Sequence, residues 1–248
     1  MKKSVTLIMF TIVFFISCNK SKEETPYICA ACTKTPQALA VNNSSSKGIY
    51  KGVFFGSTGT ISFDIQNNST AVTASLIIDG VTVSFSSGTV PQTGQPYTAT
   101  FAGTINGQPA SINFSIGADG SSPVITAASI PGHPNIAFDL LKETSVNLVE
   151  CFEGTSNGQT NNIPESGKVN LVLSRSAGTW NALTIDDRPN QYQYQYWNGI
   201  ISGNSLTCSC PPAIILSGTF SGDQINGVYS DGSPSGGGNG TWTVRRTL

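Results

Sequence analysis

The sequence is poor in the side chains that most enzymes use for catalysis. Histidine occurs once, at His133, and charged residues make up only 11% of the chain. This single histidine gives little basis for a Ser-His-Asp triad and excludes a histidine-rich metal site. The adjacent Asp186 and Asp187 would point to opposite faces of an extended strand, which is poor geometry for two glycosidase carboxylates. The composition favours a non-enzymatic protein without metal or cofactor.

Long apolar runs are also scarce, and the one at the N-terminus is too short to span a bilayer comfortably. It covers residues 5–16, follows two lysines and leads into Phe15-Ile16-Ser17-Cys18. This charged, apolar and then small order is typical of a secretory signal. The last four residues resemble the lipobox of bacterial lipoproteins, with phenylalanine where that family usually has leucine. The resemblance implies that residues 1–17 are a signal peptide and that Cys18 is lipidated.

A polar stretch follows this motif. Residues 19–24 cannot bury enough apolar surface to order themselves. Within them, Lys22-Glu23-Glu24 is similar to the tag that directs lipoproteins of the Bacteroidota type to the outer face of the outer membrane, although solvated linkers also carry such charges. Residues 25–47 contain two prolines and an Asn/Ser run, without a sustained period. We therefore expect a lipidated flexible stalk over residues 18–47, at the outer membrane and exposed on the cell surface.

The charge balance bears on possible partners. The chain has 13 basic and 14 acidic residues, and removal of Lys2 and Lys3 with the signal peptide leaves 11 and 14, a net charge near −3. Such a balance argues against nucleic acid as a partner. Hydrophobic residues form 38% of the chain, so the mature part can build one large β domain or two small ones.

Apolar and polar side chains alternate over much of the remaining chain. The clearest examples in its first half are residues 60–65, 73–78, 81–85 and 110–116. Dipeptides typical of tight hairpins occur at Asp79-Gly80, Asn106-Gly107 and Asp119-Gly120. Each alternating segment has one apolar face, as a half-buried strand does. The pattern predicts an all-β fold in which an antiparallel meander forms a β-barrel or a sandwich.

A second block, from about residue 145, repeats this style. Tyr50-Lys51-Gly52 is echoed by Phe152-Glu153-Gly154, and residues 101–107 are echoed by residues 216–222. We therefore expect β units over 48–144 and 145–248, which are either two related units in tandem or one continuous β domain.

Two further segments bear on the fold. Residues 138–143 have mild helical propensity, but the segment is short and equally suits the end of a strand. Residues 240–246 resemble the closing strand of up-and-down barrels of the lipocalin-like and avidin-like class. That resemblance defines architecture better than ligand.

Besides the lipidated one, five cysteines remain: Cys29, Cys32, Cys151, Cys208 and Cys210. In an oxidising compartment, an odd number implies that one thiol is free or pairs unusually. Cys29 and Cys32 have redox spacing, but no strand precedes them as in thioredoxin, which favours a local disulfide or two separate structural links. We predict that Cys151 pairs with Cys208 or Cys210, its neighbours in the second block. The four cysteines of the two short motifs could in principle hold a zinc ion, but the Cys-x-Cys spacing is tighter than in usual zinc sites and disfavours one.

The segment from Gln191 to Trp197 is the other unusual feature. As a strand, it places Tyr192, Tyr194 and Tyr196 on one face and Trp197 on the opposite face with the glutamines. We expect the tyrosines to be core residues whose hydroxyls reach the rim. The alternative is an exposed aromatic binding platform for sugar rings or a protein partner.

Together these patterns predict a surface-exposed binding or structural protein, anchored to the membrane by lipid and contacting a glycan or a surface protein. The alternative is an extracellular hydrolase of polysaccharide or protein, with carboxylates gathered from different strands. The acids that would have to meet, about 5 to 10 Å apart, are Glu165, Asp186, Asp187 and Asp231.

Overall fold

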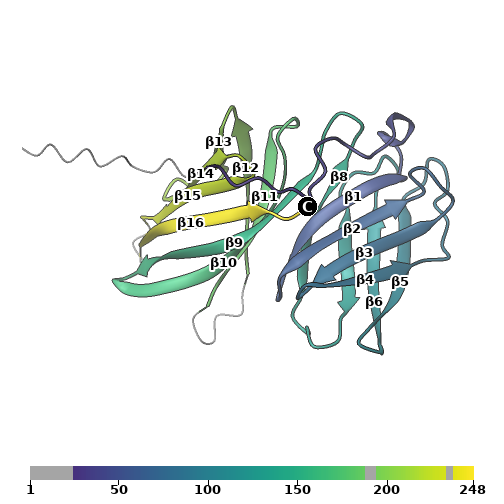
Figure 1. The fold of residues 1–248 in the computed structure, drawn as a ribbon, viewed down its shortest axis with the longest axis horizontal. Helices are drawn as coiled ribbons and strands as arrows, with labels where there is room; N and C mark the ends of the chain where they lie inside the picture. Colours follow the sequence, from purple (N-terminus) through teal and green to yellow (C-terminus); the bar gives the residue numbers. More distant parts are fainter. Residues whose placement is uncertain (1–24, 188–193, 233–236) are drawn as a thin grey trace, which may run out of the picture.

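The chain folds into two eight-stranded antiparallel units that lie side by side (Figure 1). The computed structural model describes residues 25–187, 194–232 and 237–248. Within these ranges the regular structure consists of strands and one short 3-10 turn, Ala40–Asn42. The predicted all-β meander is therefore confirmed, and it takes the form of two barrel-like units.

The first unit is a meander in which the first seven strands pair in chain order. The last strand, β8, pairs with β1 and not with β7, so β7 and β8 form the two edges of the rolled sheet. The strands of this first unit are β1 (Gly48–Phe55), β2 (Gly59–Ile65), β3 (Val72–Ile78), β4 (Val81–Ser86), β5 (Tyr97–Ile105), β6 (Gln108–Ile116), β7 (Val124–Ser129) and β8 (Ala137–Glu143).

The second unit, called the second barrel below, is a closed barrel with the same up-and-down order. The pairing of β16 with β9 closes it, so its sheet has no edge strand. Its strands are β9 (Glu150–Thr160), β10 (Ile163–Ser174), β11 (Thr179–Asp186), β12 (Gln195–Ser202), β13 (Ser205–Cys208), β14 (Ile214–Ser221), β15 (Gln224–Asp231) and β16 (Gly238–Arg246).

Two-residue turns set the register of two hairpins in the first unit. Asp79 and Gly80, between β3 and β4, have φ angles of 51° and 77°, and Asn106 and Gly107, between β5 and β6, have 49° and 79°. A tight turn with two left-handed residues matches the twist of antiparallel strands, and Asn, Asp and Gly tolerate that conformation best. The hairpin prediction at these dipeptides is confirmed.

Aromatic rings fill the interior of the first unit. Phe63 and Phe114 stack with their centroids 4.3 Å apart, and Phe101 meets Phe63 edge-on at 5.0 Å. Tyr50 packs edge-on against Phe114 at 5.3 Å. Because these rings come from β1, β2, β5 and β6, one cluster joins opposite walls of the unit. Its interior is a packed core, as in other small barrels.

One of the two sequence echoes lies at equivalent positions of the two units. Tyr50-Lys51-Gly52 belongs to β1 and Phe152-Glu153-Gly154 to β9, the first strand of each unit. Tyr50 is opposite residues of β2 and β8, as Phe152 is opposite residues of β10 and β16. The other echo pairs the fifth strand of one unit with the sixth of the other. It reflects the similar composition of glycine-rich hairpins.

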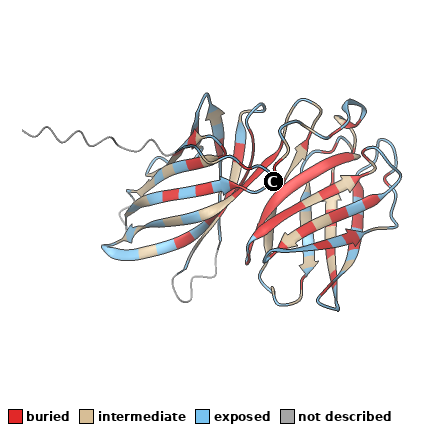
Figure 2. Ribbon diagram, viewed as in Figure 1, coloured by how far each residue is buried: buried red, intermediate tan, exposed pale blue. Residues whose placement is uncertain are grey.

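Strand β1 is buried on both faces because the second barrel packs against its outer side. Figure 2 shows this burial along the whole strand. Asn170 of β10 donates its side-chain N–H to the carbonyl of Phe54 at 2.7 Å. The apolar residues of this junction are Val53, Phe55, Val149, Cys151, Val172 and Leu183. The two units are therefore in continuous contact along β1.

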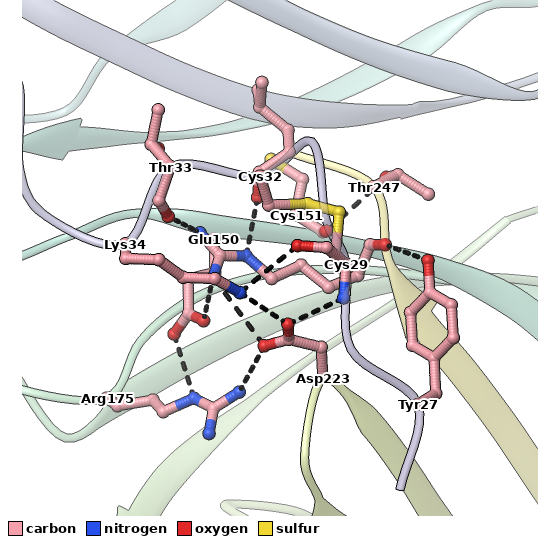
Figure 3. Close-up of a disulfide and its surroundings, with 12 residues drawn as sticks. Tyr27, Cys29, Cys32, Thr33, Lys34, Glu150, Cys151, Arg175, Asp223 and Thr247 are labelled. Carbon is pink, nitrogen blue, oxygen red and sulfur yellow. Dashed lines mark hydrogen bonds and ion pairs between the residues drawn. A yellow bond between two sulfur atoms is a disulfide. The ribbon is translucent and has the colours of Figure 1, made fainter.

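Residues 25–34 lie across one end of the second barrel (Figure 3). The Tyr27 hydroxyl donates to the carbonyl of Arg246 at 3.2 Å, and the Cys29 N–H donates to the Asp223 carboxylate at 2.8 Å. Lys34 pairs with the same carboxylate at 2.8 Å. These contacts fasten the segment to the beginning of β15 and the end of β16.

The following residues continue onto the first unit. The side-chain N–H of Asn42 donates to the carbonyl of Asn67 at 3.0 Å, and Lys142 of β8 donates to the carbonyl of Asn42 at 2.8 Å. The expectation of a flexible stalk is therefore wrong for residues 25–47. Besides a few hydrogen bonds within the segment, its polar groups find partners on both units.

Glu143, the last residue of β8, connects this N-terminal segment to both units. Its buried carboxylate pairs with the Lys51 ammonium of β1 at 2.5 Å. It also accepts the backbone N–H of Gln37 at 2.6 Å and that of Val149 at 3.1 Å. Since neither charge of the pair reaches water, each depends on the other and on these hydrogen bonds.

We expect Lys51→Met to destabilise the protein by about 3 to 5 kcal/mol, because it leaves the Glu143 carboxylate buried without its counter-charge. Urea unfolding of the mature protein measures the change. Lys168→Met is the matched control, since Lys168 lies on the exposed face of β10 and should change stability by less than about 0.5 kcal/mol. Equal stability of the two variants would contradict the assigned role of the ion pair.

Candidate functional site

The second barrel has one filled end and one open end. The β10–β11, β12–β13 and β14–β15 turns mark the filled end, called the closed end here, and residues 25–34 lie across it. The other end, called the mouth, is where β9 is followed by β10 and β13 by β14. The large side chains that fill the closed end are Phe152, Leu173, Trp180, Phe220 and Ile225.

A cavity of about 240 Å³ lies at the mouth. Three aromatic residues line it, Trp197, Tyr229 and Trp242, together with the acidic residues Glu165 and Asp231. The other polar residues of the lining are Ser156, Thr160, Ser166, Thr184, Gln195 and Ser230. A concave space with aromatic walls and a few polar groups is the usual form of a small-molecule site, and barrel mouths are a frequent location.

Glycines in neighbouring strands make room for the rings. A side chain at Gly218 of β14 or Gly227 of β15 would collide with the indole of Trp242. Likewise, a side chain at Gly158 of β9 would collide with the hydroxyl of Tyr229, and one at Gly240 of β16 would collide with its ring. Strand glycines often mark such close approaches. Alternation and motifs did not mark Tyr229 or Trp242 as site residues, and the glycines at facing positions of adjacent strands were the signal in the sequence that could have done so.

Hydrogen bonds hold the lining groups in place. The Trp197 indole N–H donates to the Thr184 hydroxyl at 2.9 Å, and the Tyr229 hydroxyl donates to the Glu165 carboxylate at 2.7 Å. The Trp242 indole N–H donates to the carbonyl of Val228 at 3.3 Å. Both indole N–H groups are thus engaged with the barrel wall, and one oxygen of Glu165 is oriented by a neighbour.

The predicted aromatic site residues lie on two opposite faces. Trp197 points into the second barrel and lines the cavity, whereas Tyr194 and Tyr196 lie outside the barrel with 48% and 50% of their surface exposed. Tyr192 falls outside the described residues. The core prediction is therefore wrong for Tyr194 and Tyr196. The side chains of β12 do alternate between two faces, but the face that points into the barrel is the one that carries Trp197.

The two exposed tyrosines lie near the junction with the first unit. The ring of Tyr194 is 6.2 Å from that of Phe55, centroid to centroid. Partial burial, together with the charge of Asp139, raises the pKa of the Tyr196 hydroxyl. Both tyrosines therefore have neighbours within the protein, while about half of each side chain stays exposed.

Asp139 of β8 is the least well paired acid at this junction. The side-chain N–H of Asn181 donates to its Oδ1 at 3.3 Å, while its buried Oδ2 has no hydrogen-bond partner among the described residues. Burial raises the pKa of the Asp139 carboxyl to about 6, although hydrogen bonds partly oppose this shift. A carboxyl in such a position is more easily accommodated when it is protonated.

An ionic cluster occupies the closed end of the second barrel. Arg246, which is almost fully buried, pairs with Glu150 at 3.1 Å, and Arg175 pairs with the same carboxylate at 3.0 Å. Asp223 joins the cluster through Lys34 at 2.8 Å (Figure 3). The cluster faces the N-terminal segment at the end opposite the cavity, so we assign it a structural role.

Two of the cysteine pairs are local disulfides. Cys29 is bonded to Cys32 and Cys208 to Cys210, while Cys151 is a free, buried thiol. The predicted link from Cys151 to the second pair is therefore wrong. Cys151 faces the junction with the first unit, whereas Cys208 packs towards the interior of the second barrel, so the two side chains lie on opposite sides of the barrel wall. Burial raises the pKa of the Cys151 thiol well above its usual range.

The acids considered for a hydrolase come together only in part. Glu165 and Asp231 line the same cavity. Asp187 is exposed at the end of β11, where it accepts a hydrogen bond from the Ser166 hydroxyl at 3.3 Å. The side chain of Asp186 lies outside the described residues. Within the described ranges, no group of three or more His, Cys, Asp or Glu side chains is arranged to hold a metal ion.

The fold is that of an all-β protein with two barrel-like units, compatible with lipocalin-like barrels. Comparison of the sequence finds no matching family model and no similar curated protein. Across the residues that the structure describes, none of the helical segments has the length and apolar character needed to cross a membrane.

Asp139 should make stability depend on pH. Its folded-state pKa of about 6 lies above the ordinary aspartate value, so the stabilising protonated form is lost as the pH rises through about 6. We expect Asp139→Asn to gain stability relative to the parent from pH 4 to pH 7, by at most about 3 kcal/mol. Urea unfolding at both pH values measures this difference.

The control for this experiment is Asp187→Asn, which removes an exposed carboxylate. Its stability relative to the parent should change little between the two pH values. If Asp139→Asn follows the same pH profile as the parent, then burial of this carboxyl does not govern the pH response of the junction.

Proposed function

We propose that this protein is a lipid-anchored binding protein of the bacterial cell envelope, which takes up a small ligand at the mouth of its second barrel. The proposal places it at the outer face of the outer membrane, without a catalytic role. The observation that carries it is the cavity, where three rings and two carboxylates surround one open space while the closed end is filled. Small-molecule sites combine these features.

The contrast between the two units supports this assignment of the site. Both have the same up-and-down order of eight strands. The first unit is filled by an aromatic cluster that includes Phe63, Phe101 and Phe114. In the second barrel, glycines and polar residues replace such side chains near the mouth. We therefore assign ligand binding to the second barrel and a supporting role to the first unit.

The position of the N-terminal segment supports an orientation relative to the membrane. Thr25 follows Cys18, the proposed lipidated residue, by seven positions. A chain of that length spans at most about 25 Å. Because Tyr27 is fastened at the closed end, that end would stay close to the bilayer. The mouth lies at the opposite ends of the strands and would face the surroundings of the cell.

Energy transfer on vesicles tests the anchor and the orientation. The acylated protein carries one fluorescent amino acid, either in place of Ser176 at the closed end or of Ile163 at the mouth, and the vesicles contain an acceptor lipid. We expect stronger transfer from position 176, because β10 separates the two sites by about 35 Å along the strand. Equal transfer, or stronger transfer from position 163, would contradict the orientation.

The control for this experiment is Cys18→Ser, which removes the acceptor of the acyl chains. This variant should leave the membrane fraction, and neither label should then transfer energy to the vesicles. Recovery of a correctly cleaved Cys18→Ser protein in the membrane pellet would reject the anchor itself, whatever the orientation.

An unbiased thermal-shift screen of small molecules tests the binding site. Compounds that bind the folded state of the parent raise its melting temperature. We expect these compounds to have no such effect on the Trp197→Ala variant. They should keep it on Tyr196→Ala, since Tyr196 is the neighbouring residue on the outside of the same strand. The screen rejects the proposed site if it finds no stabilising compound, or if every such compound stabilises both variants equally.

A polysaccharide hydrolase is the second candidate function. The observation that favours it is the presence of Glu165 and Asp231 at one cavity, because glycosidases use two acidic side chains that flank the scissile bond. The two candidates differ in the fate of a bound oligosaccharide. A binding protein returns it intact, whereas a hydrolase releases new reducing ends, and these should disappear in Glu165→Gln.

A further inference from the structure

Exposed aliphatic side chains gather along the N-terminal segment. Ile28, Leu39 and Val41 belong to this segment, and Val146 lies beside it, in the connection between the two units. Single exposed apolar residues are common on protein surfaces, whereas several on one side mark a contact surface. Provided that the lipid anchor proposed above exists, we infer that these four side chains, called the docking face here, rest on the bilayer that holds the anchor.

A short turn presents the most exposed member of the docking face. Val41 is 82% exposed and lies in the 3-10 turn Ala40–Asn42. The next residue, Asn42, is buried, and its side-chain N–H donates to the carbonyl of Asn67 at 3.0 Å. The backbone beside Val41 is therefore fixed to the first unit, while the side chain of Val41 itself stays in solvent.

A second turn presents Val146, which is 72% exposed. The backbone N–H of Asn147 donates to the carbonyl of Thr144 at 3.2 Å and closes this turn. The side chain of Asn43 connects the turn to the N-terminal segment, because it donates to the Ser145 hydroxyl at 3.0 Å and accepts the Ser145 N–H at 2.9 Å. Both valines therefore belong to one fixed surface, and no segment has to become ordered when that surface makes a contact.

The surroundings of the two valines carry little charge. Residues 37–46 and 144–149 contain no Asp, Glu, Lys or Arg. The exposed carboxylate of Asp119 lies near the Lys142 ammonium, which offsets its charge. Removing a charged group from water is costly unless the group is paired. The docking face can therefore approach the headgroup region without burying an unpaired charge.

The docking face involves both units. Figure 1 shows the N-terminal segment, in dark purple, passing from the second barrel to the first unit. Ile28 adjoins Gly222 in the β14–β15 turn, at the closed end of the second barrel. Leu39 is fixed to the first unit, because its backbone N–H donates to the Asn67 side chain at 2.9 Å. Contact with the bilayer along this segment leaves the mouth, at the other end of the second barrel, uncovered.

The anchor and the size of the docking face favour a bilayer over a protein partner. Thr25 follows Cys18 by seven positions, so a lipid on Cys18 keeps the membrane within about 25 Å of the segment. Stable protein interfaces use about 20 to 30 residues on each side, far more than the docking face offers. A small apolar contact suffices on a membrane, because the anchor keeps the effective concentration of lipid high.

Fluorescence at single positions tests this inference on vesicles of phosphatidylethanolamine and phosphatidylglycerol. The acylated protein carries an environment-sensitive fluorescent amino acid in place of Val41 or, as the matched control, of Val81. Val81 is also an exposed valine, but it follows the Asp79-Gly80 turn at the opposite end of the first unit. We expect emission from position 41 to shift to the blue and to be quenched at least about twofold by brominated acyl chains. Emission from position 81 should do neither.

Replacement of the two most exposed valines by serine removes apolar surface and leaves the anchor in place. In Val41→Ser/Val146→Ser, the fluorescent amino acid at position 39 should lose at least about half of its quenching by brominated lipid. The control is Val81→Ser/Val228→Ser, which alters two exposed valines outside the docking face and should leave the quenching unchanged. Urea unfolding curves verify that both double variants retain the fold.

The anchor and the docking face fail in different ways. Acylated protein that sediments with the vesicles, while position 41 emits as position 81 does, would overturn the docking face and leave the anchor intact. A blue shift at position 41 that appears without vesicles and grows with protein concentration would assign the face to a second copy of the chain, and would also overturn the inference. If the acylated parent leaves the vesicles as Cys18→Ser should, the anchor and the docking face are both rejected.

Discussion

One buried carboxylate joins three parts of the chain. Glu143 ends the last strand of the first unit, pairs with Lys51 in its first strand, and accepts backbone N–H groups from Gln37 and Val149. A charge without access to water is tolerated only while all of these partners are in place. The pairing of β8 with β1, the path of the N-terminal segment and the start of the second barrel are therefore coupled, and that segment continues to the closed end beneath the cavity.

The two units show how one topology can give a filled core or a binding space. Both are up-and-down arrangements of eight strands, so their backbones enclose comparable interiors. In the first unit, stacked rings such as Phe63 and Phe114 meet across the interior. In the second barrel, rings such as Trp242 lie against glycines of the neighbouring strands, which leaves space at the mouth. Side-chain volume, and not strand order, therefore distinguishes the two interiors.

Particular residues show where prediction from sequence ended. Residues 138–143 have some helical propensity, yet they form β8 because pairing with β1 and the buried bonds of Glu143 outweigh a weak local preference. Alternation separated Trp197 from Tyr196 correctly, but alternation alone cannot say which side of a strand faces inward. The disulfide predicted for Cys151 failed for a related reason, since sharing a block of sequence does not place two cysteines on the same side of a barrel wall: Cys151 faces the junction and Cys208 the interior.

The sequence by itself determined the class of fold, the hairpin turns and the lack of residues for a histidine-based active site, because these follow from alternation, local backbone preferences and composition. The tertiary structure alone decided that residues 25–47 are packed, that β1 is buried on both faces, and that Glu165, Tyr229 and Trp242 meet at one cavity. Contacts of this kind join residues far apart in the chain, and their geometry depends on the closure and packing of both units, which local sequence patterns do not encode.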